Sequence, residues 1–142
     1  AKAGTVNKQM VSNLDFAQTF LDLAGLEQPS DMQGKSLKPL FEGKKTDDWR
    51  DSIYYHYYCF PEYHAVRRHD GVRNSQYKLM HFYDIDEWEL FDLSKDPDEL
   101  VNVVHDPAYQ ETHQHLMKEM MHRVMLQQFP LPPRDLVVIG AH

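Results

Sequence analysis

The hydrophobic pattern at the start of the chain is that of an amphipathic helix. Apolar residues recur at intervals of three and four between Ser12 and Gly25, which places them on one helical face that is expected to be buried. The residues on this face are Phe16, Ala17, Phe20, Leu21, Leu23 and Ala24. Ser12 or Asn13 is suited to cap the start of the helix, and Gly25 to end it in a left-handed conformation. A short helical turn is then predicted through residues 37–40.

After Trp49 the pattern changes to short stretches of aromatic and β-branched residues, separated by turn-forming residues. Such side chains pack well on the surface of a sheet. Four strands are predicted, over residues 52–60, 66–72, 76–83 and 88–93. Because their connections are shorter than the roughly twelve residues that a parallel crossover needs, we expect antiparallel strands in a meander.

Asp106 and Pro107 indicate the start of a long helix, since aspartate caps helices and proline favours the first helical position. The residues that follow carry an apolar stripe made of Tyr109, Leu116, Met117, Met120, Met121, Val124 and Met125. This stripe needs a sheet or another helix to cover it. Prolines at positions 130, 132 and 133 end the helix, and residues 136–139 are expected to form an edge strand or a clasp.

Together these elements predict an α+β fold. A small antiparallel sheet of about four strands is expected to pack against the long C-terminal helix, after a helical first part. A charged, solvated stretch at residues 44–48 separates the two parts. The expected division is therefore residues 1–45 for the helical part and residues 46–142 for the sheet and the long helix.

The composition and charge of the chain argue against several classes of function. The chain has 142 residues and a formal net charge of −7, which disfavours binding to nucleic acid or anionic lipid. No apolar run approaches the roughly 20 residues of a membrane span. The single cysteine, Cys59, excludes an internal disulfide and a multi-thiolate zinc site. Residues 1–10 contain neither a starting methionine nor an apolar signal core, so we expect the chain to be cut from within a longer one.

Nine histidines raise the question of a metal site. His113 and His115 are two residues apart on the predicted helix, so they point to different sides and cannot share an ion. His56, His64 and His69 lie in the sheet region and could converge, but they lack the tight spacing and the third firm ligand of a zinc site. We therefore expect no metal site and interpret the histidines as surface or hydrogen-bonded side chains.

Basic and aromatic residues are concentrated in one part of this acidic chain. They are His64, Arg67, Arg68, His69, Arg73 and Lys78, flanked by Tyr55, Tyr57 and Tyr63. Guanidinium and imidazole donors suit sulfate or hydroxyl oxygens, and tyrosine rings stack on pyranose faces, so an anionic or sugar ligand is one interpretation. The other is a solvated strand-turn face with local ion pairs, for instance to Asp70.

Four blocks of sequence together resemble the carboxy-terminal part of the sulfatase family, in the alkaline phosphatase superfamily. They are VSNLDFAQTFLDLAGLEQPSDMQGKSLKPLF at residues 11–41, DWRDSIYYHYY ending at Tyr58, GVRNSQYKLMHFY at residues 71–83 and ELFDLSKDPDELVN at residues 89–102. The resemblance covers about residues 1–128, and the joint occurrence of the blocks is more specific than any one of them. It implies that residues 1–45 are the end of a catalytic α/β domain and that residues 46–142 form a smaller subdomain.

The resemblance also implies hydrolysis of sulfate esters. The family uses a formylglycine, made from cysteine or serine in a C/S-x-P/A-x-R motif, beside a calcium ion held by aspartate and asparagine. In this chain the run that starts at Cys59 matches only the first three positions, because Tyr63 stands where arginine is required. We therefore expect formylglycine and calcium in a separate catalytic domain, no catalytic or metal-binding residue here, and no sulfatase activity of this chain alone.

In sulfatases this subdomain borders the active-site cleft, so the resemblance implies saccharide contacts. We expect them from Tyr57, His64, Arg67 and His69. The block YYHYYCFPEYHAVRRHDGVR is similar to carbohydrate sulfatases, including N-acetylglucosamine-6-sulfatase-like enzymes. The expected partners are a sulfated saccharide and the rest of the sulfatase chain, with no nucleic acid and no membrane span.

The apolar face of the helix at residues 15–24 is expected to be covered by the catalytic domain in the longer protein. This chain alone is then expected to expose that face and to form a homodimer through it. Two other interpretations stay open: an autonomous carbohydrate- or protein-binding module, and the C-terminal part of a related phosphoesterase or phosphonate hydrolase. The sequence leaves the compartment open, and a bacterial parent is expected to be periplasmic or secreted.

Overall fold

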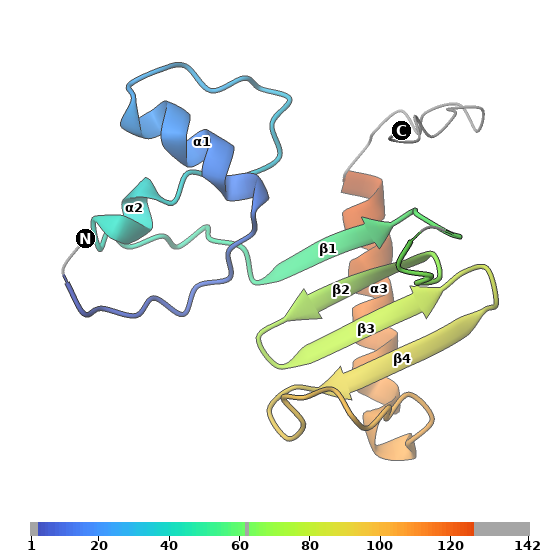
Figure 1. The fold of residues 1–142 in the computed structure, drawn as a ribbon. Helices are drawn as coiled ribbons and strands as arrows, with labels where there is room; N and C mark the ends of the chain where they lie inside the picture. The colour runs from blue at the N-terminus through green and yellow to red at the C-terminus, as the bar shows by residue number, and fades with distance from the viewer. Residues whose placement is uncertain (1–2, 62, 127–142) are drawn as a thin grey trace. The chain divides into compact units, whose positions relative to one another are not determined.

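The computed structural model describes residues 3–61 and 63–126 (Figure 1). The chain divides into two units, Ala1–Ile53 and Tyr54–His142. The first unit contains two helices, and the second contains most of a four-stranded sheet and a long helix. The sequence also predicts a domain boundary between residues 45 and 46, where the end of a catalytic domain would meet the smaller subdomain. This boundary stays a prediction.

In the first unit, helix α1 (Leu14–Leu23) lies within the range that its apolar spacing predicts. The hydroxyl of Ser12 accepts a hydrogen bond from the N–H of the first residue of α1 (3.4 Å), and Gly25 follows the helix with a φ of +69°. Glycine tolerates this left-handed conformation because it has no Cβ. The short helix α2 (Lys38–Phe41) carries a proline in its first turn, where the missing N–H costs nothing.

Helix α1 turns its polar side inward. Three of its polar side chains are buried: Asp15, Gln18 and Thr19. Four large apolar side chains are 53–69% exposed: Leu14, Phe16, Phe20 and Leu23. The expectation that this chain exposes the apolar face of α1 is confirmed. The prediction from apolar spacing that this face is buried is wrong for the chain alone. The reason is that polar side chains satisfy the backbone groups of residues 32–37, which apolar side chains cannot do.

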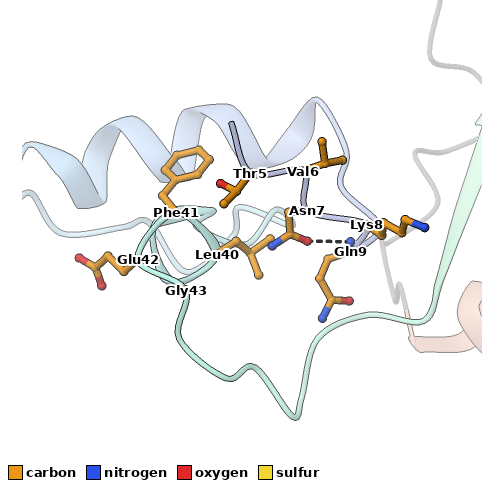
Figure 2. A pocket seen from close by; sticks show the side chains of 9 residues that line it. All are labelled: Thr5, Val6, Asn7, Lys8, Gln9, Leu40, Phe41, Glu42 and Gly43. Carbon is orange, nitrogen blue, oxygen red and sulfur yellow. Dashed lines mark hydrogen bonds between the residues drawn. The ribbon is translucent and has the colours of Figure 1, made fainter. Parts of the chain in front are cut away.

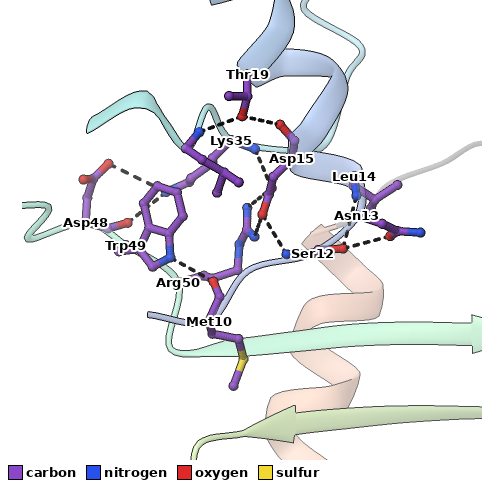
Figure 3. A network of polar contacts seen from close by, with 11 residues as sticks. Met10, Ser12, Asn13, Leu14, Asp15, Thr19, Lys35, Asp48, Trp49 and Arg50 are labelled. Atoms are coloured by element: carbon purple, nitrogen blue, oxygen red, sulfur yellow. Dashed lines mark hydrogen bonds and ion pairs between the residues drawn. The ribbon is translucent and has the colours of Figure 1, made fainter. Parts of the chain in front are cut away.

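Asp15 is the centre of a polar network in this unit (Figure 3). Its carboxylate accepts hydrogen bonds from the backbone N–H groups of Ser12 (2.7 Å) and Lys35 (2.8 Å). It also accepts two hydrogen bonds from the guanidinium of Arg50. Burial raises the pKa of Asp15, but the hydrogen bonds from Arg50 and the two N–H groups outweigh burial and hold the pKa below its ordinary value.

The polar side of α1 also forms hydrogen bonds with residues 32–37, the segment that precedes α2. The hydroxyl of Thr19 accepts the N–H of Leu37 (2.8 Å), and the side-chain amide of Gln18 donates to the carbonyl of Met32 (2.8 Å). Between these contacts, Gly34 approaches α1 so closely that a Cβ there would lie 2.1 Å from the carbonyl oxygen of the first α1 residue. This close approach therefore requires glycine.

The second unit is built on an antiparallel sheet whose strand order, β1-β2-β3-β4, follows the chain. The strands are β1 (Ser52–Tyr57), β2 (His69–Asn74), β3 (Tyr77–Phe82) and β4 (Glu87–Asp92). Val72 of β2 lies opposite Leu79 of β3, which lies opposite Leu90 of β4. The predicted meander of four strands is confirmed.

Helix α3 (Gln110–Leu126) covers one face of this sheet (Figure 1), after the 3-10 turn η1 (Pro107–Tyr109). The carboxylate of Asp106 accepts the N–H of Ala108 (2.9 Å), as the predicted cap requires. The buried apolar core between sheet and helix consists of Val72, Leu79, Leu90, Val104, Leu116 and Met120. The predicted α+β fold, with a sheet packed on a long helix, is therefore confirmed.

The apolar stripe predicted for α3 is only partly buried. Leu116 and Met120 are buried, while Met121, Val124 and Met125 in the last turns are exposed. The expectations for residues 130–139 fall outside the described residues. No helix in the described ranges is both long and apolar enough to cross a membrane.

Candidate functional site

Two connections leave the sheet at the same end. The β1–β2 loop, described at residues 58–61 and 63–68, and the β3–β4 turn (residues 83–86) lie together because β1 and β3 run in the same direction (Figure 1). We call this end of the sheet the loop end. All four residues for which saccharide contacts are expected belong to it: Tyr57, His64, Arg67 and His69.

His69, the first residue of β2, lies among three aromatic rings. Its imidazole stacks on the ring of Tyr57, with centroids 5.4 Å apart and planes 21° from parallel. The ring of Phe82 lies 5.1 Å from it, and that of Tyr55 meets it edge-on at 5.8 Å. Because side chains alternate along a strand, these rings lie on the face of the sheet that α3 does not cover.

A backbone contact sets the tautomer of His69. Its Nδ1 lies 2.8 Å from the carbonyl oxygen of Arg67. A carbonyl oxygen only accepts, so Nδ1 carries the proton and the neutral ring presents the lone pair of Nε2. No described residue hydrogen-bonds to Nε2.

Arg67 and His64 are exposed residues of the β1–β2 loop. The guanidinium carbon of Arg67 lies 5.3 Å from the ring centroid of Phe60, a cation–π contact. His64 meets the ring of Tyr63 edge-on at 5.3 Å, and no contact with a described residue joins it to the rings around His69. The structure thus places Arg67 beside His69 through its backbone and leaves His64 apart.

The loop end combines three kinds of group that suit a sulfated sugar. Aromatic rings offer apolar faces to the C–H side of a pyranose. An imidazole exchanges hydrogen bonds with hydroxyl groups, and a guanidinium donates paired hydrogen bonds to sulfate oxygens. The chemical character of these groups suits an anionic sugar, with the rings on the strands and the charge in the loop.

Sequence reasoning missed two aromatic members of this surface, Phe82 and Phe60. The register pairs Asp70 with His81, and this sets the next residue, Phe82, beside His69. Strand alternation would have found this neighbour had the register been known. Phe60 lies in the loop, whose conformation no periodic pattern encodes.

Arg73 and Lys78 belong to the same basic group in the sequence but lie elsewhere in the fold. They oppose each other in the register of β2 and β3, beside the turn at the other end of the sheet. The ammonium group of Lys78 pairs with the carboxylate of Glu99. The basic group is therefore divided between the two ends of the sheet.

On the α3 side of the sheet, His56 is held by two tyrosine hydroxyls. Its ring nitrogens lie 3.2 Å from that of Tyr54 and 3.0 Å from that of Tyr83. Burial lowers the pKa of His56, which favours the neutral ring. Within residues 3–61 and 63–126, no three histidine, cysteine, aspartate or glutamate side chains gather as metal ligands.

The residues that the structure describes do not fit the formylglycine and calcium of sulfatases. Cys59 is an exposed residue of the β1–β2 loop, and Tyr63 stands at the position of the required arginine. No described cluster of carboxylates offers calcium a set of ligands. No catalytic step is therefore assigned to this chain.

A separate hollow of about 620 Å³ lies in the first unit (Figure 2). It is lined by residues 5–9 and residues 40–43. The amide oxygen of Asn7 accepts the N–H of Gln9 (2.8 Å), so it is engaged within its own segment. None of the residues for which saccharide contacts are expected lines this hollow.

A family model described as N-sulphoglucosamine sulphohydrolase, C-terminal, matches residues 1–126. The chain belongs to this sulfatase family. It is 50% identical over 120 residues to an N-acetylglucosamine-6-O-sulfatase of Bacteroides thetaiotaomicron, a match that covers 82% of this chain and 22% of the relative. The resemblance to the carboxy-terminal part of sulfatases is thereby confirmed.

Solved structures agree with this assignment. A protein in complex with its substrate, D-glucosamine-2-N,6-O-disulfate, matches with a TM-score of 0.77 and 45% identity over 85% of this chain and 25% of that one. A phosphonate monoester hydrolase from Silicibacter pomeroyi matches with a TM-score of 0.75 over 89% of this chain and 27% of that one. Because the two are only 24% identical, this match shows a shared fold alone. This C-terminal sulfatase domain thus spans about a quarter of the proteins it matches.

Proposed function

We propose that this C-terminal sulfatase domain serves an enzyme that acts on sulfated amino sugars, and that its loop end contacts the sugar. The observation that carries the proposal is the stacked pair of Tyr57 and His69 at the loop end, to which the exposed Arg67 of the β1–β2 loop also belongs. It occurs in a chain that is 50% identical to an N-acetylglucosamine-6-O-sulfatase over the matched residues.

Each residue of the loop end would make a different contact. The ring of Tyr57 would pack on the sugar, and Nε2 of His69 would accept a hydrogen bond from a hydroxyl group. The exposed guanidinium of Arg67 would donate to the sulfate oxygens. His64 would contact the sugar from the middle of the β1–β2 loop.

The reaction itself would take place in another part of a longer sulfatase, where formylglycine and calcium would activate the sulfate ester. The apolar face of α1 is suited to pack against that part, because its large side chains are more than half exposed here. The polar side of the same helix holds the first unit together. The domain would thus border the reacting group without taking part in bond breaking.

The experiment is a titration of the isotope-labelled chain with N-acetylglucosamine 6-sulfate, followed by two-dimensional NMR. We expect chemical-shift changes at His69 and in the β1–β2 loop, and smaller ones with N-acetylglucosamine, which lacks the sulfate. N-acetylglucosamine 6-phosphate tests the related phosphoesterase interpretation in the same way.

Matched variants localise the binding. Arg67→Met and His69→Ala should weaken binding about tenfold, the usual cost of a lost charged or polar contact. Arg73→Met removes an arginine from the other end of the sheet and should leave binding unchanged. Shifts confined to residues outside the loop end, or equal effects of all three variants, would contradict the proposal.

A further inference from the structure

Arg68, which precedes β2, makes three contacts at the base of the β1–β2 loop. Its Nε donates to the carbonyl oxygen of Tyr58 (3.0 Å), and its Nη2 donates to the carbonyl oxygen of Phe60 (2.6 Å). Its Nη1 lies 3.7 Å from the carboxylate of Asp84 in the β3–β4 turn. One side chain therefore joins the two ends of the loop to each other and to the neighbouring turn.

These contacts are made where strand pairing no longer orders the chain. Strand β1 ends at Tyr57 and β2 begins at His69, so the carbonyl groups of Tyr58 and Phe60 lie outside both strands. Backbone carbonyl groups need hydrogen-bond partners, and a guanidinium can satisfy two of them at once. The contacts of Arg68 thus satisfy carbonyl groups of the loop, as pairing between strands satisfies those of the sheet.

We infer that Arg68 is a positioning residue that holds the β1–β2 loop for sugar binding, an inference that rests on the function proposed for the loop end. Its three nitrogens face protein oxygens, which distinguishes it from Arg67, whose guanidinium is exposed over a ring. The adjacent arginines therefore have different roles: Arg67 meets the ligand, and Arg68 sets the shape of the loop that presents Arg67 and His64.

Lysine could not replace this arginine. The contacts reach two carbonyl oxygens and one carboxylate in different directions, which matches the planar fork of a guanidinium. An ammonium group is a compact charge on a flexible stem and would meet one of these oxygens at a time. Because the side chain of Arg68 is 41% exposed, its ion pair with Asp84 is screened by water, and the two carbonyl contacts should dominate.

The test compares Arg68→Met, Arg68→Lys and the adjacent control Arg67→Met in the full chain. Hydrogen exchange is measured for the backbone amides of the β1–β2 loop. We expect Arg68→Met to speed this exchange about tenfold, Arg68→Lys to recover less than half of the effect on a logarithmic scale, and Arg67→Met to change it no more than about twofold.

The urea midpoint of the second unit separates positioning from a general structural role. It should change little in Arg68→Met, because the contacts lie outside the apolar core. Unchanged loop exchange, or faster exchange that spreads through the core strands together with a lower midpoint, would overturn the inference.

Binding of N-acetylglucosamine 6-sulfate then tests the proposed function separately. If Arg68 positions a sugar-binding loop, Arg68→Met weakens binding and loosens the loop, while Arg67→Met weakens binding without loosening it. Suppose that Arg68→Met loosens the loop but no form of the chain binds the sugar measurably. This result would refute the proposed function, while the role of Arg68 in ordering the loop would still hold. Weaker binding with an unaltered loop would refute positioning alone.

Discussion

Arg50 donates two parallel hydrogen bonds to the carboxylate of Asp15, from Nη1 to Oδ2 (2.5 Å) and from Nη2 to Oδ1 (2.7 Å). Asp15 is fully buried, and the side chain of Arg50 is 13% exposed. The pair connects the first turn of α1 to the end of the first unit, 35 residues further along the chain. This buried ion pair therefore ties α1 to the last residues of the first unit.

Replacing Asp15 with asparagine should destabilise the first unit by about 3 kcal/mol, because a buried guanidinium is left without its counter-charge. Urea unfolding followed by Trp49 fluorescence measures this, in a Trp88→Phe background that removes the other tryptophan. Asp48→Asn is the control: Asp48 is 93% exposed and should cost less than about 0.5 kcal/mol. Equal midpoints for the two variants would contradict the role of the pair.

The same carboxylate predicts the response of the first unit to acid. The folded pKa of Asp15 lies below its ordinary value of 3.8, so the unfolded chain binds more protons in this range. Its contribution is complete above the unfolded pKa and is lost as the pH falls through the folded pKa. Residues 1–53 contain no histidine, so the unfolding free energy should stay nearly constant between about pH 7 and 5 and then decrease.

Asp15→Asn should make this acid decrease shallower without removing it. The remainder comes from Asp22, whose pKa is lowered by hydrogen bonds from Ser36 and Lys38, and from Glu42, whose pKa is lowered by Lys44. An unfolding free energy measured from pH 7 to 3 tests this. An identical acid response with and without the Asp15 carboxylate would show that its folded pKa is not depressed.

Gly34→Ala should destabilise the first unit by about 2 kcal/mol, because the new Cβ would collide with backbone atoms that cannot move away without shifting α1. The added methyl group would lie 2.1 Å from a carbonyl oxygen of α1. Gln33→Ala changes the preceding, exposed residue and serves as the control. Thermal unfolding followed by Trp49 fluorescence should separate the two variants clearly, and similar melting temperatures would refute the close approach.

The exposed face of α1 predicts self-association of this chain when no other part of a sulfatase covers it. We expect a homodimer by sedimentation equilibrium, and a monomer when Phe20 and Leu23 are both replaced by glutamate. Leu100, which is 80% exposed in the second unit, provides the control substitution Leu100→Glu. A wild-type monomer at high concentration, or a dimer that survives the double substitution, would contradict this use of the helix.

Exchanging the matched 120 residues of the Bacteroides N-acetylglucosamine-6-O-sulfatase for those of this chain should give an active enzyme. In that chimera, His69→Ala should raise KM for N-acetylglucosamine 6-sulfate about tenfold and change kcat much less, since the residue would bind sugar without joining the reaction. Arg73→Met is again the distant control. A loss of kcat alone would place His69 in the chemistry instead.

The elements of the second unit could be predicted because each has a local signal. Turn-forming residues separate the strands, and Asp106 with Pro107 marks the start of the last helix. The strand ends differ from prediction by up to three residues, because pairing stops at Tyr57 and resumes at His69. Residues of the loop between them have aromatic character but no partner strand in the described sheet.

The candidate site could be predicted only in part. The basic and aromatic composition of residues 54–73 pointed to Tyr55, Tyr57, Arg67 and His69, since type and closeness in sequence are visible in one chain, but not to Phe60 or Phe82. The stacking of Tyr57 on His69 depends on register, and the contacts of Arg68 depend on the path of a loop, so neither has a periodic signal. The expected roles of Tyr57, His64, Arg67 and His69 stay predictions.

The inverted packing of α1 also bears on how this helix evolves. Substitutions at Asp15, Gln18 and Thr19 must be matched by changes in the nearby residues 32–37 and at Arg50, all in the same gene segment. Substitutions at Phe16 or Phe20 meet no such constraint from this unit. The two sides of one helix should therefore drift at different rates, and covariation in an alignment of sulfatases should connect each side to a different set of positions.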